Sequence, residues 1–292
     1  MTTSFENKKQ LRFVVTLAEG VFSDKNNQVV LDGFRAVVEV QKAGGQMMST
    51  STVRIYGLAQ ELMNQLTTLA FKAMSYVKNT IDIIVIDGDQ QVLIFRGQII
   101  NAWGDYSGMP DVCLYIETQT GYFQQVELGN PLAYKGVANV SDLMSVLAGR
   151  LGVPLENNNV TAKISNPNYP GSTIDQIRNL ASDTKTDFYL DDTVLAICPR
   201  GLTRKPQTAN APLISSQSGM IGYPTFDKVG ITFSTLFNPS IKFGGQIIME
   251  SDIPQANGLW QVCSMVHKLE SEKPGGAWFT MIRCTGNGLV PL

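Results

Sequence analysis

Two long stretches of this sequence alternate apolar and polar side chains, and this alternation restricts the possible folds more than any other feature. The first stretch covers residues 11–118, and the second runs from residue 229 to the end. Val38 and Val40, for example, alternate with Glu39 and Gln41. A period of two is the pattern of a strand that buries one face. We therefore predict two strand-rich sections, separated by a segment of different character.

The clearest hairpin in the first section surrounds the sequence DGDQ, residues 87–90. Apolar strand patterns flank it at residues 81–86 and 92–100. Asp87 and Gly88 can adopt the positive φ angles that a tight turn between antiparallel strands requires. The sequence therefore predicts two paired strands that meet at this turn.

The stretch STVRIYGLAQELMNQL, residues 51–66, changes its period in the middle. Up to Gly57 apolar and polar residues alternate, and after it an apolar residue recurs at every third or fourth position. Such spacing places apolar side chains on one face of a helix. We expect a strand that leads directly into a helix, with four leucines on the helix face that packs against the protein: Leu58, Leu62, Leu66 and Leu69.

The section between the two strand-rich stretches, residues 125–206, mixes helical and strand patterns. The segment VSDLMSVLAGRLG predicts a helix with Ser141 as a plausible N-cap. STIDQIRNLASDT predicts a second amphipathic helix, whose apolar face carries Ile174, Ile177 and Leu180. DFYLDDTVLAICP predicts a hairpin that turns at Asp191 and Asp192.

Together these patterns predict a mainly β protein with an α+β insert. The predicted domains are residues 1–124, 125–206 and 207–292. Charged residues make up only 16% of the chain and the net charge is −2, so the bulk charge favours neither nucleic acid nor an anionic membrane as a ligand. No apolar run reaches the roughly 20 residues that span a bilayer, and the first residues lack a signal-peptide pattern. We expect the chain to fold in the cytoplasm.

The residues that usually perform chemistry do not combine into a site. His267 is the only histidine in the sequence, and it lies within a strand pattern. This position predicts that His267 has a structural role and is not a catalytic base. The acidic pairs 87/89, 183/187 and 191/192 fit turns or helix ends better than a pair of catalytic carboxylates. The cysteines lie far apart in apolar runs and predict core positions: Cys113, Cys198, Cys263 and Cys284. We expect no metal, no cofactor and no enzyme activity.

A resemblance to a known family supplies the function that composition does not. A strand ending in RIYGL and followed at once by a leucine-periodic helix resembles the first domain of phage tail baseplate hub proteins, those of contractile tails in particular. In that family the strand closes a small, tail-tube-like β-barrel, and the helix packs on the barrel's outer flank. The segments VSDLMSVLAGRLGV and LASDTKTDFYLDDTVLAICP also resemble that family. The closing section resembles its second barrel, so the resemblance covers residues 11–286.

The resemblance implies a structural rather than a catalytic role. Two tube-like barrels in one chain mean that a homotrimer presents six barrels, which suits a hexameric tail tube on one side and a trimeric central spike on the other. The implied partners are the tail tube protein, the spike protein, and the tape measure protein and other baseplate proteins. The implied location is the tail baseplate of the virion. DNA would pass through the lumen without being held there.

Two other classes remain open at this point. One is another tail-tip component, such as a tube initiator or a distal tail protein, and the other is a cell-wall hydrolase or a carbohydrate-binding module. For a contact surface we predict the loop KAGGQMMST, and within it Gln46, Met47, Met48 and Ser49, because methionine on a flexible connection adapts well to a partner. The alternative is that this loop folds back on its own barrel.

Overall fold

The computed structural model describes residues 9–18, 21–22, 25–43, 47–67, 78–88, 90–204 and 211–286. It is mainly β, as the alternation predicts. The described residues divide into two compact units. The first unit draws on Met1–Gln41, Thr50–Tyr122 and His267–Phe279, and the second on Lys42–Ser49, Phe123–Val266 and Thr280–Leu292.

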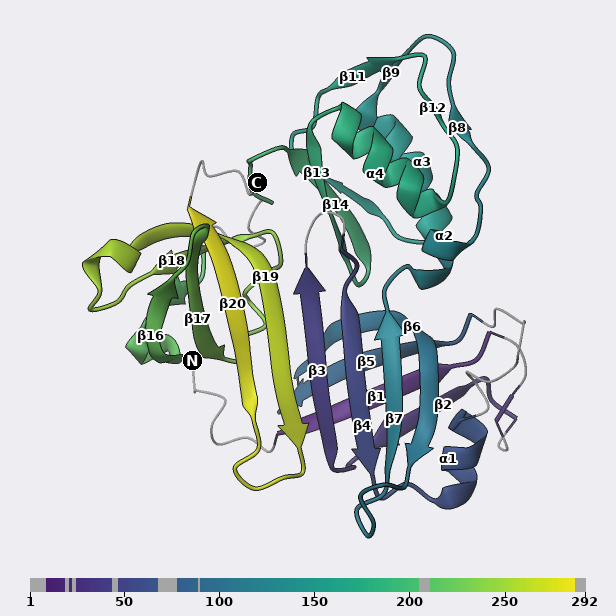
Figure 1. Cartoon of the computed structure of the whole chain (residues 1–292), viewed down its shortest axis with the longest axis vertical. Coiled ribbons are helices and arrows are strands. Elements are labelled where there is room, and N and C mark those ends of the chain that lie inside the picture. Colours follow the sequence, from purple (N-terminus) through teal and green to yellow (C-terminus); the bar gives the residue numbers. More distant parts are fainter. Residues whose placement is uncertain are drawn as a thin grey trace. The chain divides into compact units, whose positions relative to one another are not determined.

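The first unit is built on one sheet (Figure 1). Its strand order is the end of β19, then β3, β4, β7, β6, β5, β1 and β2. The register of the pairs from β3 to β2 is antiparallel throughout. The strands are β1 (Gln10–Thr16), β2 (Gln28–Asp32), β3 (Ala36–Ala43), β4 (Thr50–Tyr56), β5 (Thr80–Asp87), β6 (Gln90–Asp105), β7 (Cys113–Gln119) and β19 (Gly258–Ser271).

The strands of this sheet bury alternate residues, as a period of two requires. In β3, Ala36, Val38 and Val40 are buried, whereas Glu39 is partly exposed. The predicted hairpin joins β5 to β6, and Gly88 has the positive φ of 58° that its turn demands. Asp89 lies outside the described residues. The strands and the hairpin are therefore confirmed, but Asp87, which was expected to share the positive φ of the turn, is the last residue of β5 and pairs with Gln90.

Helix α1 (Gln60–Thr67) follows β4 after three connecting residues, the first of which is Gly57 with φ of 80°. Without a Cβ, Gly57 can take this left-handed conformation and turn the chain out of the strand. The buried residues of the helix are Met63 and Leu66, so the predicted leucine face is only partly correct. Leu58 is buried just before the helix, Leu62 is partly buried, and Leu69 lies outside the described residues. The helix packs against β6.

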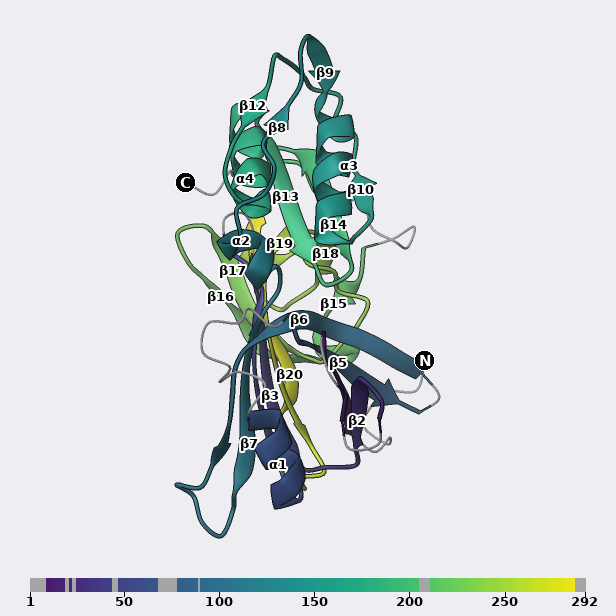
Figure 2. The same ribbon diagram turned by 90° about the vertical axis from the view of Figure 1, so that its right-hand side faces the viewer.

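The second unit contains the mixed section. Helices α3 (Val140–Leu151) and α4 (Thr173–Asp183) lie side by side against the hairpin of β13 (Thr186–Asp191) and β14 (Val194–Pro199), as Figure 2 shows. β10 (Leu155–Asn157) adds a parallel strand to β14. The smaller elements are α2 (Tyr122–Val126), β8 (Leu132–Ala133), β9 (Val137–Asn139), β11 (Lys163–Ser165) and β12 (Asn168–Tyr169).

The helix caps correct one sequence prediction. Asn139, not Ser141, is the N-cap of α3, and Ser141 lies inside the first turn. The Asn139 side chain donates to Asp142 at 2.8 Å instead of capping a backbone N–H. Ser172 caps α4, because its hydroxyl accepts from the Asp175 N–H at 3.1 Å. Both predicted helices are otherwise confirmed.

The β13–β14 hairpin is buried on both faces. One face joins the core under α3 and α4, and the other joins the core of the closing strands. The residues of the first face are Phe188, Leu190, Leu195 and Ile197, and those of the second are Tyr189, Ala196 and Cys198. A strand buried on both sides reads as a nearly continuous apolar run, which explains the sequence VLAIC.

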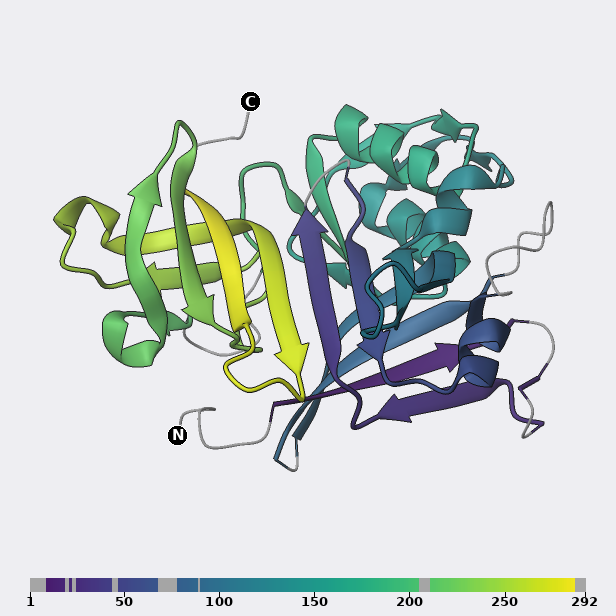
Figure 3. The same ribbon diagram turned by 60° about the horizontal axis from the view of Figure 1, so that its bottom comes forward.

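The closing strands of the second unit have the order β16, β17, β20, β19, β18, β15. In Figure 3 the light-green hairpin of β16 and β17 lies beside the yellow β20. Two 3-10 turns, η1 (Ser216–Ser218) and η2 (Pro254–Ala256), lie between strands. The strands are β15 (Leu213–Ile214), β16 (Met220–Phe226), β17 (Gly230–Leu236), β18 (Gln246–Met249) and β20 (Trp278–Gly286).

This order repeats that of the first unit. If five strands are numbered along the chain, β3 to β7 lie in the order first, second, fifth, fourth, third. The strands β16 to β20 lie in the same order. Where the first set has α1 between its second and third strands, the second set has a loop that contains Ile241 and Phe243. The three-domain division predicted from the sequence remains a prediction.

Candidate functional site

The predicted contact loop begins at the end of β3 and ends at the start of β4. Met47 is 69% exposed, as a contact residue on a free surface should be. Met48 was predicted to contact a partner, but it packs against the core under α3 and α4. Ser49 is only 2% exposed, and its hydroxyl has no hydrogen-bond partner. Gln46 lies outside the described residues. A role of these residues in contacts between proteins remains a prediction.

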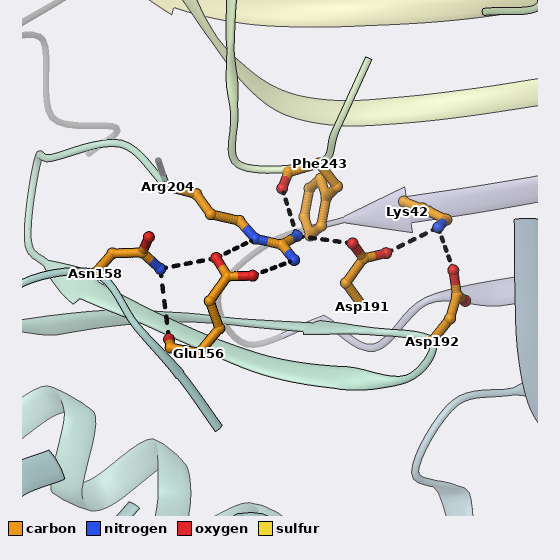
Figure 4. Close-up of polar contacts among 7 residues, drawn as sticks. All are labelled: Lys42, Glu156, Asn158, Asp191, Asp192, Arg204 and Phe243. Carbon is orange, nitrogen blue, oxygen red and sulfur yellow. Dashed lines mark hydrogen bonds and ion pairs between the residues drawn. The ribbon is translucent and has the colours of Figure 1, made fainter. Parts of the chain in front are cut away.

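Lys42, at the base of this loop, is buried among charged groups (Figure 4). Its ammonium donates to the Asp191 carboxylate at 2.9 Å and also to the carboxylate of Asp192. Asp191 is the last residue of β13, and Asp192 has a positive φ of 45° in the turn that follows. The hairpin prediction placed the turn correctly, and the structure adds that a lysine binds both of its acidic residues.

Arg204 occupies the other side of Asp191. Its guanidinium binds Glu156 through two bonds, Nε to Oε1 at 2.7 Å and Nη2 to Oε2 at 2.9 Å. Its Nη1 donates to Asp191 at 2.7 Å and to the backbone oxygen of Phe243 at 3.3 Å. The Arg204 side chain is 4% exposed. A two-bond fork of this kind fixes both direction and distance, which a lysine at this position would not do.

Asn158 completes the network around Glu156. Its amide donates to the Glu156 carboxylate at 3.0 Å and to the backbone oxygen of Ile197 at 3.2 Å. We call this set the charge network: Lys42, Glu156, Asn158, Asp191, Asp192 and Arg204. It links the end of β3, strand β10, the β13–β14 turn and, through Phe243, the loop before β18. All of these segments belong to the second unit.

The electrostatics of the network favour the charged form of every member whose pKa is shifted. Burial alone raises the pKa of Asp191, but the positive charges of Lys42 and Arg204 outweigh it and hold that pKa well below its usual range. Burial alone lowers the pKa of Lys42, but Asp192 and Asp191 outweigh it and raise that pKa. The hydrogen bond from Arg204 lowers the pKa of Glu156. The network therefore consists of charges that compensate one another.

The geometry of this cluster indicates a structural role, in which ion pairs hold neighbouring segments of the second unit together. The two cations occupy the carboxylate oxygens, and each pair is held at hydrogen-bonding distance. Among the described residues, no group of three or more His, Cys, Asp or Glu side chains could hold a metal ion. This cluster could not be predicted from the sequence, because Arg204 lies in the polar stretch GLTRKPQT, where an arginine is normally exposed on a connection.

The residues considered for catalysis lie in structural positions. His267 is buried within β19. Asp183 accepts a hydrogen bond from the Tyr169 hydroxyl at 2.7 Å. Cys113, Cys198 and Cys284 are buried and Cys263 is partly buried, and all four are free thiols. Burial raises the pKa of Cys198 to about 12, which keeps this thiol protonated and a poor nucleophile.

Exposed apolar side chains gather on two parts of the closing strands. Leu213, Ile248 and Leu259 are all exposed and lie opposite one another on β15, β18 and β19. On β16, the strand at the end of the sheet, the exposed apolar residues are Ile221, Tyr223 and Phe226. Such groupings mark contact surfaces more often than single exposed leucines do.

No helix among the described residues is long and apolar enough to cross a membrane.

A family model described as Baseplate hub gp41 matches residues 11–281 of the chain. A search of curated proteins finds no match to this chain.

Solved structures of tail proteins share the fold. A tail protein from Neisseria meningitidis MC58 is 11% identical with a TM-score of 0.62, covering 95% of this chain and 98% of its own. The 43 kDa tail protein of prophage MuSo2 from Shewanella oneidensis is 10% identical with a TM-score of 0.61, covering 96% and 98%. A type VI secretion component from E. coli, described as similar to the T4 tail proteins gp27 and gp5, is 8% identical with a TM-score of 0.58, covering 89% and 77%. At such identities the likeness shows the fold alone.

Proposed function

Since the chain belongs to the baseplate hub gp41 family, a family of structural components of phage tails, we propose that three copies form a ring. This ring joins the tail tube to the central spike. In this proposal each copy contributes two tube-like barrels, separated by the α+β insert. The ring then has threefold symmetry in its chains and approximate sixfold symmetry in its barrels. It adapts a hexameric tube to a trimeric spike.

The observation that carries this proposal is the repeated strand order. The strands β3 to β7 and β16 to β20 follow one topology although they lie at opposite ends of the chain. A duplicated module is what a trimer needs in order to present six similar surfaces. A chain with one such module would present only three. The proposed pairing of the barrels around a ring also suits closed cyclic symmetry.

The charges on the exposed side of the first sheet fit the passage of DNA. Arg54 lies over the ring of Tyr115 at 5.3 Å, and Lys268 lies 3.8 Å from Glu39. Both of these positive groups therefore have an acidic or aromatic neighbour. A channel that binds phosphates tightly would hold the genome, because each cationic contact adds affinity. We propose that this side of the sheet faces the lumen and lets DNA slide.

The mass of the assembled protein tests the proposal. One chain has a mass of 31.9 kDa, so a trimer has a mass of about 96 kDa. We expect native mass spectrometry to find this species at high protein concentration, and the same stoichiometry in disassembled tails. A chain that stays at 31.9 kDa in solution and occurs in six copies per tail would contradict the trimeric ring.

A change at Met47 tests the predicted contact loop. The Met47→Asp variant should keep the stability of the wild type, because Met47 is 69% exposed, yet it should weaken assembly into tails by tenfold or more. Met48→Asp is not a clean test, because it would place a charge against the core under α3 and α4. The measurement is the fraction of the variant incorporated into tails. Equal incorporation of Met47→Asp and wild type would show that the loop makes no such contact.

A further inference from the structure

Three apolar side chains form a row on the outer face of the closing strands. Leu213 of β15 lies opposite Ile248 of β18, and Ile248 lies opposite Leu259 of β19. They are 46%, 39% and 41% exposed. Their neighbours Ile214 and Ile247 belong to the core, and successive side chains of a strand point to opposite faces, so the row lies on the face away from that core. We call these three residues the exposed row.

The end of β20 lies close to the exposed row. A short connection, residues 272–277, joins β19 to β20, and the two strands are neighbours in the sheet, so they run antiparallel. The Cys263 thiol donates to the backbone oxygen of Arg283 at 3.2 Å. By the same register, Gly286 at the end of β20 lies beside residues 259–261. The chain therefore leaves the sheet next to one end of the row.

The residues that follow Gly286 are apolar and uncharged. They read NGLVPL, residues 287–292, and lie outside the described residues and beyond residue 281, where the family match ends. Asn-Gly is a common turn sequence. Fully extended, this segment spans about 20 Å. The three strand spacings from β20 across β19 and β18 to β15 amount to about 14 Å. The segment is therefore long enough to reach the whole row.

The neighbours of β20 restrict where this segment can go. Strands β17 and β19 occupy the two edges of β20, so the chain cannot turn back beside it within the sheet. The inner face is filled by the core, where Ile282 and Cys284 are both 0% exposed. Pro291 has no N–H, which makes the segment a poor additional strand for the edge at β15. The outer face, with the exposed row, is the remaining apolar surface within reach.

We propose that residues 289–292 fold over the exposed row of their own chain and cover it. Leu289, Val290 and Leu292 pack on the row, which removes apolar surface on both sides from water. The short tether to β20 gives this segment a high effective concentration at the row, so it outcompetes a second copy. The inference concerns one chain and does not depend on the proposed ring. A covered row does not offer an apolar surface to unrelated proteins before the tail assembles.

Hydroxyl radical footprinting, read by mass spectrometry of the full chain, tests this cover. The segment variant carries Leu289→Ser and Val290→Ser, which weaken the apolar contact without changing the charge. The matched control carries Leu128→Ser and Val126→Ser, since these residues are of the same types, are exposed, and lie in neither the row nor the segment. Labelling of the exposed row should rise severalfold in the segment variant and should stay at the wild-type level in the control. Circular dichroism checks that both variants keep the fold.

Equal labelling of the row in the wild type and in the segment variant would overturn the proposal. Strong labelling in both would show that nothing covers the row, and weak labelling in both would show that another surface does. Protection by a segment of the same chain should not change when the protein is diluted. Protection that is lost on dilution would identify a second copy as the cover and would also contradict the proposal. A chain that stays monomeric and still protects its row would support this inference even if the ring were contradicted.

Discussion

Replacing Arg204 with alanine should lower the free energy of unfolding by about 3–5 kcal/mol, because removal of one partner leaves a buried charge without compensation. Arg204 is 4% exposed and binds both Glu156 and Asp191. Without it, the partner left to Asp191 among the described residues is Lys42, and the one left to Glu156 is Asn158. The backbone oxygen of Phe243 also loses a donor. The loss should appear in urea unfolding followed by circular dichroism.

A surface ion pair provides the control for this change. Arg12 binds Asp32 at 2.8 Å, in a pair that is partly exposed to solvent. Arg12→Ala should therefore cost far less stability than Arg204→Ala, because water screens an exposed ion pair. Equal losses of stability in the two arginine variants would show that the charge network stabilises the fold no more than a surface ion pair does. A further variant, Arg204→Lys, should recover only part of the loss, since lysine cannot form the two-bond fork to Glu156.

The second large effect is the dependence of this stabilisation on pH. The pKa of Asp191 and that of Glu156 are lowered in the folded chain, so their contribution is present above the unfolded pKa and is lost as the pH falls. The pKa of Lys42 is raised, so its contribution is present below the unfolded pKa and is lost as the pH rises. With ordinary values of about 4 for carboxyls and about 10.4 for lysine, the network should stabilise fully between about pH 5 and pH 9.

The stability difference between wild type and Arg204→Ala measures this window directly. It should be constant from about pH 5 to about pH 9 and should shrink below about pH 4, as protons bind the carboxylates of the unfolded chain. Other titrating groups affect both proteins alike, so the difference isolates the network. A difference that varied steeply through neutral pH would contradict this description, because it would require a network member to titrate there.

The strands were the most predictable part of the fold. Alternation of buried and exposed residues is a local signal, and Val38 and Val40 lie on the buried face as the pattern requires. The turns at Gly88 and at Asp191 and Asp192 were also predictable, since turn residues have strong local preferences. The N-cap of α3 was placed two residues too late, because both Asn139 and Ser141 suit the position by type.

The site was less predictable, because its contacts join distant positions. Lys42 and Asp191 are 149 residues apart in the sequence, and Arg204 and Glu156 are 48 apart. No local pattern distinguishes these residues from ordinary surface charges. Met48 illustrates the reverse case: a methionine in a loop suggests exposure, yet Met48 packs against a core formed by other segments.

A reconstruction of the isolated tail tip, computed without imposed symmetry, tests the central claim most directly. The account predicts three copies of this chain in one ring. Six strand sets then surround the lumen, and the set β3 to β7 alternates with the set β16 to β20. It also predicts that the two sets superpose after a rotation of about one sixth of a turn. A ring of six copies, or one lined by only one of the two sets, would contradict it.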